Sequence, residues 1–149
     1  MYRLVIAAIG LAAVALLAPG CGSSSNAGET VEALTKAQFV KQADEGCAEV
    51  AKKREAAAAA WREEHPREVA PNELREAFKE VVAPAVREQV EVLEALAEPQ
   101  ADGAPVARMV KNLSKAGAEF EREGIESPEA RQFQAEARKY GLKICSRLY

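Results

Sequence analysis

Few side chains in this sequence have the type and spacing that metal binding or redox chemistry needs. His65 is the one histidine, and it could act as a metal ligand or a general base. Its position just before Pro66, where a helix is expected to end, favours a simpler role in which it complements the helix dipole and caps carbonyl groups. The residue three positions earlier is Arg62, so the Glu-x-x-His pattern of di-iron bundles does not occur, and neither does the Cys-x-x-Cys-His pattern of covalent haem. We therefore expect no metal and no cofactor.

The sequence also gives little support for hydrolytic chemistry. One histidine and a few serines, three of them at 23–25 in a Gly/Ser-rich stretch, leave little material for a Ser-His-Asp arrangement. A hydrolase built on two converging carboxylates stays open as an alternative. The acidic residues, however, have the spacing of solvated helix faces, as in Glu73, Glu76 and Glu80, or Glu119, Glu121 and Glu123. The sequence thus favours a protein that is not an enzyme.

Two aromatic residues and one alanine run are candidates for binding. Trp61 and Tyr140 could line a pocket for a small apolar ligand between helices, although a lone Trp on an apolar stripe is more often part of the core. The run Ala56–Ala60 could form a smooth face on which another helix docks, or an alanine-rich layer of the core. The sequence leaves both pairs of interpretations open.

The first twenty residues differ in character from the rest of the chain. One basic residue, Arg3, precedes an uncharged apolar stretch from Leu4 to Ala18, and Pro19, Gly20 and Cys21 follow. This is the layout of a secretory signal peptide. The apolar stretch is shorter than the roughly 18 to 20 residues that a membrane-spanning helix needs, so a permanent transmembrane anchor is the weaker interpretation.

The residues Leu16-Leu17-Ala18-Pro19-Gly20-Cys21 resemble the lipobox of bacterial lipoproteins, in which the signal is cut before a cysteine that then carries diacylglycerol. Gly20 and Cys21 match well, whereas the family usually has Leu at the position of Ala18, and Pro19 is unusual there. The resemblance implies lipidation of Cys21. The alternative is cleavage by the general signal peptidase, for example after Ala27, which would release a soluble protein.

The number of cysteines supports lipidation independently. Three cysteines leave one spare thiol in an oxidising compartment, where it can form unwanted cross-links. If Cys21 is acylated, Cys47 and Cys145 remain as a pair that can form a disulfide. Two or three acyl chains would hold the protein firmly on a bilayer. We therefore expect an exported protein that is anchored by lipid to the outer face of the cell membrane.

Composition sets the remaining bounds. The segment 22–30, GSSSNAGET, cannot bury apolar surface and is typical of a flexible tether. Together with the signal peptide, this divides the chain into three parts: a signal peptide at 1–20, a lipidated cysteine with its tether at 21–33, and one domain at 34–149. The formal net charge is −3, without a block of Lys and Arg. This balance argues against a nucleic-acid partner and against electrostatic adhesion to anionic lipid.

Periodic apolar residues predict four helices and no sheet. The first begins after Thr35, which forms a capping box with Gln38, and ends near His65. The second runs from about Pro71 to about Ala97, with a kink near Glu80 to Pro84. The third follows a loop at 98–105 and ends at Gly124. The fourth starts after Ser127 and either ends at Gly141 or continues past it. The pattern places Leu74 on the apolar face of the second helix, and Ile144 and Leu148 on the apolar face of the fourth.

Short connections between four helices favour an antiparallel up-down-up-down four-helix bundle. In such a bundle the early part of the first helix lies beside the late part of the fourth, which is where Cys47 and Cys145 occur. The topology therefore predicts a disulfide between them. Closing a loop of about 100 residues would contribute roughly 4 to 5 kcal/mol in the chain-entropy model.

Four short motifs resemble a set of uncharacterised exported lipoproteins of high-GC Gram-positive bacteria. They are the start Leu34-Thr35-Lys36-Ala37-Gln38-Phe39, the helix Ala43-Asp44-Glu45-Gly46-Cys47, the stretch Leu93-Glu94-Ala95-Leu96 before Pro99, and the end Tyr140-Gly141-Leu142-Lys143-Ile144-Cys145. The resemblance implies the paired cysteines and the envelope location, and it supplies no catalytic residue. We expect a non-catalytic domain that binds an envelope protein or the cell wall near the membrane, with a carrier of a small apolar ligand as the alternative.

Overall fold

The computed structural model describes residues 33–65 and 70–149. The expected signal peptide at 1–20, Cys21 and all but the last residue of the expected tether at 21–33 lie outside this part of the chain. The described residues are all-helical and contain no strand; one isolated bridge joins Leu34 and Pro99. No helix among the described residues is both long and apolar enough to cross a membrane.

The first helix, α1 (Lys36–Glu64), begins as predicted. The backbone N–H of Gln38 donates to the hydroxyl of Thr35 over 3.2 Å, and the backbone N–H of Thr35 donates to the side-chain oxygen of Gln38 over 2.8 Å. These two bonds complete the capping box and satisfy donors that a helix start leaves free. The helix buries one side, at Phe39, Ala43, Cys47, Val50 and Trp61.

The second helical stretch is divided where Pro84 was expected to disturb it. It consists of α2 (Pro71–Ala77), the π-helical turn η1 (Phe78–Val82) and α3 (Ala83–Glu94). Proline lacks a backbone N–H and crowds the carbonyl group four residues earlier. The wide turn accommodates both effects, because the N–H of Ala83 donates to the carbonyl of Phe78, five residues back. The predicted kink is thus realised as a π-helical turn.

Two details of this stretch differ from the prediction. Leu74 does not join the apolar face; its side chain is 52% exposed. The π-helical turn takes one extra residue, which rotates the faces on either side of it by about 100° relative to each other. The helix also ends at Glu94 rather than Ala97, because the chain turns there to bring Gln100 onto the start of the domain, where its N–H donates to the carbonyl of Leu34 over 3.1 Å.

The helix α4 (Gly103–Glu123) begins earlier than the predicted loop allowed. Pro105 lies in its first turn, where a helix tolerates proline because the missing N–H would have no partner there. It ends at Gly124, which adopts the left-handed conformation with φ 62° as expected for a helix stop. The helix α5 (Pro128–Tyr140) then starts after Ser127, whose hydroxyl accepts the N–H of Ala130 over 3.2 Å.

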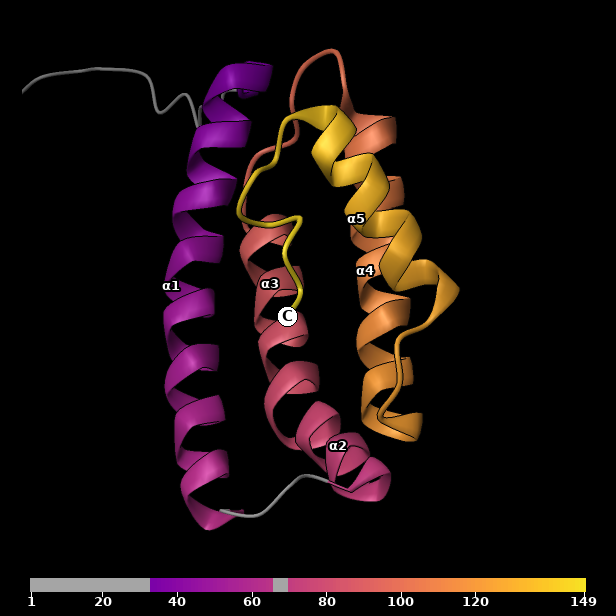
Figure 1. Cartoon of the computed structure of the whole chain (residues 1–149). Coiled ribbons are helices and arrows are strands. Elements are labelled where there is room, and N and C mark those ends of the chain that lie inside the picture. Colours follow the sequence, from indigo (N-terminus) through magenta and orange to yellow (C-terminus); the bar gives the residue numbers. More distant parts are fainter. Residues whose placement is uncertain (1–32, 66–69) are drawn as a thin grey trace, which may run out of the picture. The chain divides into compact units, whose positions relative to one another are not determined.

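Gly141 ends α5, with φ 116°, which is one of the two outcomes that the sequence left open. The prediction that Ile144 and Leu148 lie on the apolar face of the fourth helix is therefore wrong. Residues 141–149, which we call the C-terminal segment, turn back between α1 and α5 and lie over α3 (Figure 1). A left-handed glycine stops the helical hydrogen bonding, and the next amides find another acceptor, described below.

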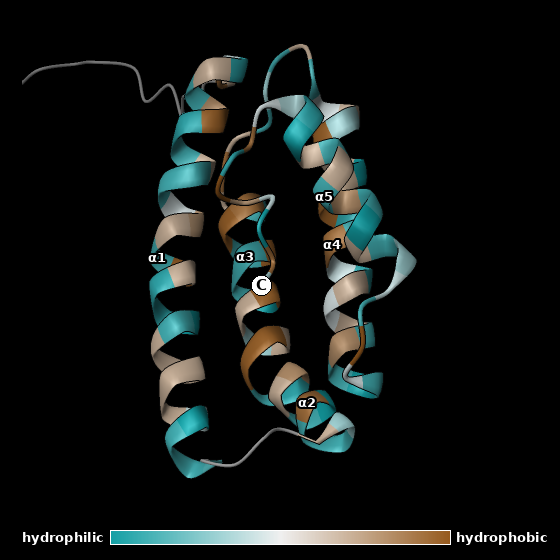
Figure 2. Cartoon of the chain, in the orientation of Figure 1, coloured by the Kyte–Doolittle hydropathy of each residue, from teal (hydrophilic) through white to brown (hydrophobic). Residues whose placement is uncertain are grey.

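The main helix contacts join α1 with α3, α3 with α4, and α4 with α5. Figure 2 shows the most hydrophobic colouring on α3, which lies between α1 and the other two helices. The core is built from fully buried side chains of α1, α3, α4 and α5, and the C-terminal segment contributes to it, whereas α2 has no buried residue. The largest of these side chains are Phe39, Phe120, Phe133, Leu113, Leu142 and Leu148. The C-terminal segment therefore closes the side of the core that α1 and α5 leave open.

Candidate functional site

Cys47 and Cys145 form the disulfide that the sequence predicts. Both side chains are buried, and their Cα atoms are 5.1 Å apart. Cys47 lies on α1 as expected, whereas Cys145 lies in the C-terminal segment and not on a helix. The bond therefore fixes an irregular segment to the first helix, across a sequence separation of 98 residues.

Asp44 holds the same segment by hydrogen bonds, and the sequence analysis did not identify it. Its carboxylate accepts the backbone N–H groups of Lys143, Ile144 and Cys145 over 2.9, 2.9 and 3.1 Å. Charge-assisted bonds of this kind are stronger than neutral ones. The available signal was the spacing: Asp44 lies three residues before Cys47 and so shares its helix face.

Tyr140 lies in a surface pocket of about 290 Å³ at the end of the domain where α1 begins. Lys36, Arg108 and Lys139 line this pocket together with Glu136, Pro105 and Met109. The amino group of Lys36 is 4.2 Å from the centre of the Tyr140 ring, in cation–π contact. The pocket thus combines an aromatic wall with three cations and one carboxylate.

Electrostatics within this pocket leave a positive excess. Arg108 pairs with Glu136 over 3.3 Å, which occupies the one carboxylate in the lining. The Tyr140 hydroxyl donates to Asp102 over 3.2 Å. Burial, this hydrogen bond and the charge of Asp102 together raise the pKa of Tyr140 to about 12. Tyr140 therefore keeps its proton to high pH and donates it to Asp102, and the pocket is lined by charged as well as apolar side chains.

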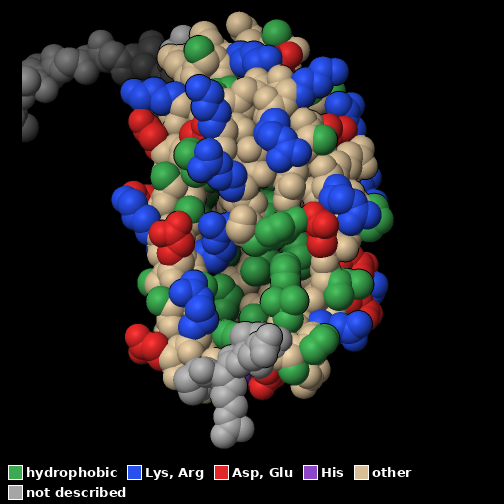
Figure 3. Space-filling model, viewed as in Figure 1, with side chains coloured by type: hydrophobic (Ala, Val, Ile, Leu, Met, Phe, Trp, Pro, Cys, Tyr) green, Lys and Arg blue, Asp and Glu red, His purple; other side chains and the backbone are tan. Residues whose placement is uncertain are grey.

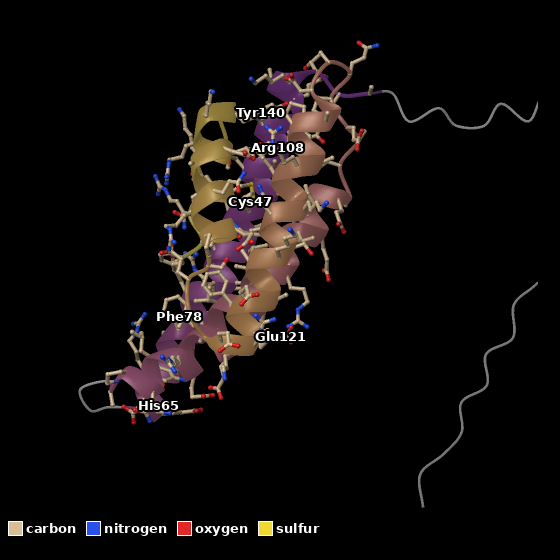
Figure 4. The ribbon with its side chains drawn as sticks, turned by 90° about the vertical axis from the view of Figure 1, so that its right-hand side faces the viewer. Cys47, His65, Phe78, Arg108, Glu121 and Tyr140 are labelled. Atoms are coloured by element: carbon tan, nitrogen blue, oxygen red, sulfur yellow. A yellow bond between two sulfur atoms is a disulfide. The ribbon has the colours of Figure 1, made fainter. Side chains whose placement is uncertain are left out.

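Trp61 lies at the other end of α1 and does not share this pocket. Its indole ring stacks on His65, with ring centres 4.0 Å apart, and its N–H donates to Glu80 over 3.1 Å. Figure 4 places His65 and Tyr140 at opposite ends of the domain. The structure thus does not bring together the two aromatic residues that the sequence suggested as a joint ligand site.

His65 takes the structural position expected of a residue at a helix end. Its ring nitrogen Nδ1 is 2.8 Å from the carbonyl of Trp61, and its backbone N–H donates to the same carbonyl. Within residues 33–65 and 70–149, no group of three or more His, Cys, Asp or Glu side chains is arranged to hold a metal ion.

Apolar side chains are exposed near the Trp61 end. Ile125 and Tyr149 are 46% and 53% exposed, and Tyr149 packs edge-on against Phe78. Arg75, next to Leu74 on α2, has its carbonyl directly against Gly124, which brings Leu74 to this end as well. Most of the run Ala56–Ala60 is also exposed, so it does not form the core layer that was one of its two interpretations.

Two further surface pockets lie between α3 and α4. The larger has a volume of about 570 Å³ and includes Leu93, Leu96 and Val110 together with Lys111 and Lys115. The smaller, of about 200 Å³, is lined by Val90, Gly117 and other residues of the same two helices. Trp61 lines none of the three pockets described for this part of the chain.

Comparison with protein-family models, with curated proteins and with solved structures gives no match for this chain. The resemblance to exported lipoproteins accordingly stays a prediction from short motifs.

Proposed function

We propose that the protein is a non-catalytic lipoprotein of the cell envelope, in which a helical domain is held on the outer face of the membrane through Cys21. The observation that carries the proposal is the disulfide between Cys47 and Cys145. Disulfides persist in exported proteins and are rare in reducing compartments. Two paired cysteines leave Cys21 as the single remaining thiol, directly after the apolar stretch.

The non-catalytic part of the proposal rests on the side chains that are described. The single histidine stacks on Trp61 and is bound to a backbone carbonyl. Many carboxylates form ion pairs with neighbouring cations, for example Glu119 with Arg122 over 2.7 Å and Glu49 with Lys52 over 2.7 Å. These arrangements support a binding or structural role.

We further assign the domain to the antiparallel up-down-up-down four-helix bundles, preceded by a signal helix. Support comes from the order of the helix contacts and from the short connections between the helices. In this assignment the C-terminal segment takes the place of the last turns of the fourth helix.

The partner that we propose is an envelope protein or the cell wall. The exposed alanine run on α1 and the exposed apolar side chains of Leu74, Ile125 and Tyr149 support a docking surface at the Trp61 end. The alternative, a carrier for a small apolar ligand, has less support, because Tyr140 lies among charged side chains and Trp61 donates a hydrogen bond to Glu80.

Mass spectrometry of the mature protein tests the proposal. We expect a chain that starts at Cys21, carries the mass of a diacylglycerol on that residue and contains Cys47 and Cys145 as a disulfide. A chain that starts at Gly28 without lipid, or one that retains residues 1–20, would contradict the lipoprotein assignment.

A photo-crosslinking amino acid at Ala57 tests the docking surface in intact cells. We expect one dominant cross-linked species from this position. The matched control is the same amino acid at Glu91, which is exposed on α3. Cross-linked products of equal yield from both positions, or none from either, would count against a partner at the alanine run.

A further inference from the structure

Basic residues are concentrated near the end of the sequence, and the fold brings Lys36 and Arg54 of α1 beside them. Helix α5 and the C-terminal segment, residues 128–149, carry five Lys or Arg against two Glu, whereas residues 71–98 carry three Lys or Arg against seven Glu. The first region covers the side of the domain between α1 and α5, and the second contains α3. Basic residues are therefore in excess in one region and acidic residues in another, so the small net charge, which argued against adhesion to anionic lipid, does not describe the side between α1 and α5.

Four exposed cations define what we call the basic face: Arg138, Lys139, Lys143 and Arg147. None of the four pairs within 4.0 Å with a carboxylate of residues 33–65 or 70–149. Figure 3 shows Lys and Arg side chains over the upper part of this side of the molecule. In Figure 4 nitrogen-tipped side chains project from the outer side of α5.

Nearby residues of α1 extend the basic face toward the start of the domain. Lys36 contacts the Tyr140 ring and shares its pocket with Lys139. Farther along α1, Arg54 donates to the carbonyl of Arg147 over 3.2 Å. Lys36 and Arg54 thus join the basic face in a strip that begins at the first residue of α1.

Carboxylates next to this strip are turned to other partners. Asp44 directs both oxygens at the backbone N–H groups of the C-terminal segment. Glu136 pairs with Arg108, and Asp102 accepts the hydroxyl of Tyr140. The side chains of the basic face therefore remain available to an external anion.

We propose that the basic face lies on the anionic headgroups of the membrane that holds the protein. This inference rests on the proposed lipid anchor. Cys21 precedes Lys36 by fifteen positions, and an extended chain spans at most roughly 3.3 to 3.6 Å per residue. The anchor would therefore keep the strip within about 55 Å of the headgroups at most. Lys and Arg side chains are attracted to an anionic surface within about one Debye length, roughly 10 Å at 0.1 M salt.

Lysine acetylation followed by mass spectrometry tests the inference. The full-length protein is isolated from membranes, reconstituted into vesicles of phosphatidylcholine alone or mixed with phosphatidylglycerol, and treated briefly with an amine-reactive acetylating reagent. Lys139 and Lys143 report on the basic face, and Lys111 and Lys115, which line the pocket between α3 and α4, are internal controls in the same molecule.

With phosphatidylglycerol, we expect acetylation of Lys139 and Lys143 to slow by roughly threefold or more, while Lys111 and Lys115 keep their rates. High salt should restore the faster rates, because it screens surface electrostatics. Equal rates on both kinds of vesicle would overturn the inference, and so would equal protection of all four lysines. Protection of Lys139 and Lys143 by a soluble polyphosphate but not by vesicles would also overturn it, in favour of an anionic wall polymer.

Charge reversal provides a second measurement. The variant Lys139→Glu/Lys143→Glu should lose the protection of Lys36 by phosphatidylglycerol, whereas the matched variant Lys111→Glu/Lys115→Glu should keep it. Retained protection of Lys36 in the first variant would contradict the inference. Flotation with phosphatidylcholine vesicles and the mass of the Cys21 peptide report separately on the anchor, so failure of the anchor and failure of the basic face are distinguishable.

Discussion

Asp44 shows how one carboxylate can organise a segment that has no regular structure. Residues 143–145 are not part of a helix, so their backbone N–H groups have no helical carbonyl as acceptor. Burying such N–H groups without a hydrogen-bond partner is unfavourable in free energy. The carboxylate of Asp44 meets all three from α1. It therefore holds the C-terminal segment on α1 beside the disulfide.

The variant Asp44→Ala should destabilise the domain by about 2 to 3 kcal/mol, since it removes three charge-assisted acceptors from backbone donors. Urea unfolding followed by circular dichroism measures the change. Its neighbour Glu45 provides a matched control, because its one ion pair, with Lys41 at 3.9 Å, is exposed. Glu45→Ala should change the stability by less than about 0.5 kcal/mol. Similar effects of the two variants would contradict the assigned role of Asp44.

The raised pKa of Tyr140 predicts that the stability of the folded domain depends on pH. Its pKa is about 12 in the folded domain, against 10.0 for a tyrosine exposed to solvent, so the folded state retains the phenol proton more strongly than the unfolded state. The resulting stabilisation is complete below pH 10 and is lost as the pH rises toward 12.

Ultraviolet titration of the tyrosinate absorbance should assign this high pKa to Tyr140, because the step disappears in Tyr140→Phe. In Asp102→Asn, which removes the charge and keeps an acceptor, the pKa of Tyr140 should fall toward 10 without reaching it, since burial is the largest cause of the shift. An unchanged titration in Asp102→Asn would show that Asp102 does not contribute.

At the scale of the element, the helix boundaries follow local chemistry closely. Thr35, Ser127 and Gly124 cap their helices as the sequence predicts. The same local rules could not place the face of Leu74, because they assume one helical period throughout, and the π-helical turn at Phe78–Val82 breaks that period. Pro84 indicated where the break falls but not how the backbone would resolve it.

Gly124 joins two elements as well as ending one. A Cβ atom at this position would lie 2.3 Å from the carbonyl oxygen of Arg75 on α2, and the φ of 62° disfavours other residues. Gly124→Ala should therefore destabilise the domain by more than about 2 kcal/mol in urea unfolding. The control Gly103→Ala meets only the flexible end of the Glu98 side chain and should cost less than about 1 kcal/mol. A mild effect at Gly124 would indicate that α2 moves away easily.

For the whole molecule, the disulfide is the longest-range covalent constraint among the described residues. It closes a loop across 98 positions, and in the chain-entropy model its loss costs roughly 4 to 5 kcal/mol. The double variant Cys47→Ser/Cys145→Ser should show this loss by urea unfolding, and the wild-type protein in reducing agent should show the same. Cys21→Ser, which leaves the pair intact, should unfold like the wild type. A small loss in the double variant would mean that the hydrogen bonds of Asp44 hold the segment by themselves.

By itself, the sequence determined the features that depend on neighbours in the chain. Helix starts and stops follow from caps, prolines and glycines within a few residues, and the pairing of Cys47 with Cys145 follows from the small number of cysteines and from helix order. Only the tertiary structure decided which surfaces these elements create. The separation of Trp61 from Tyr140, the contact of Asp44 with residues 143–145 and the contact of Lys36 with Tyr140 all depend on how distant segments pack. Burial and electrostatic fields are set by distance in space rather than along the chain.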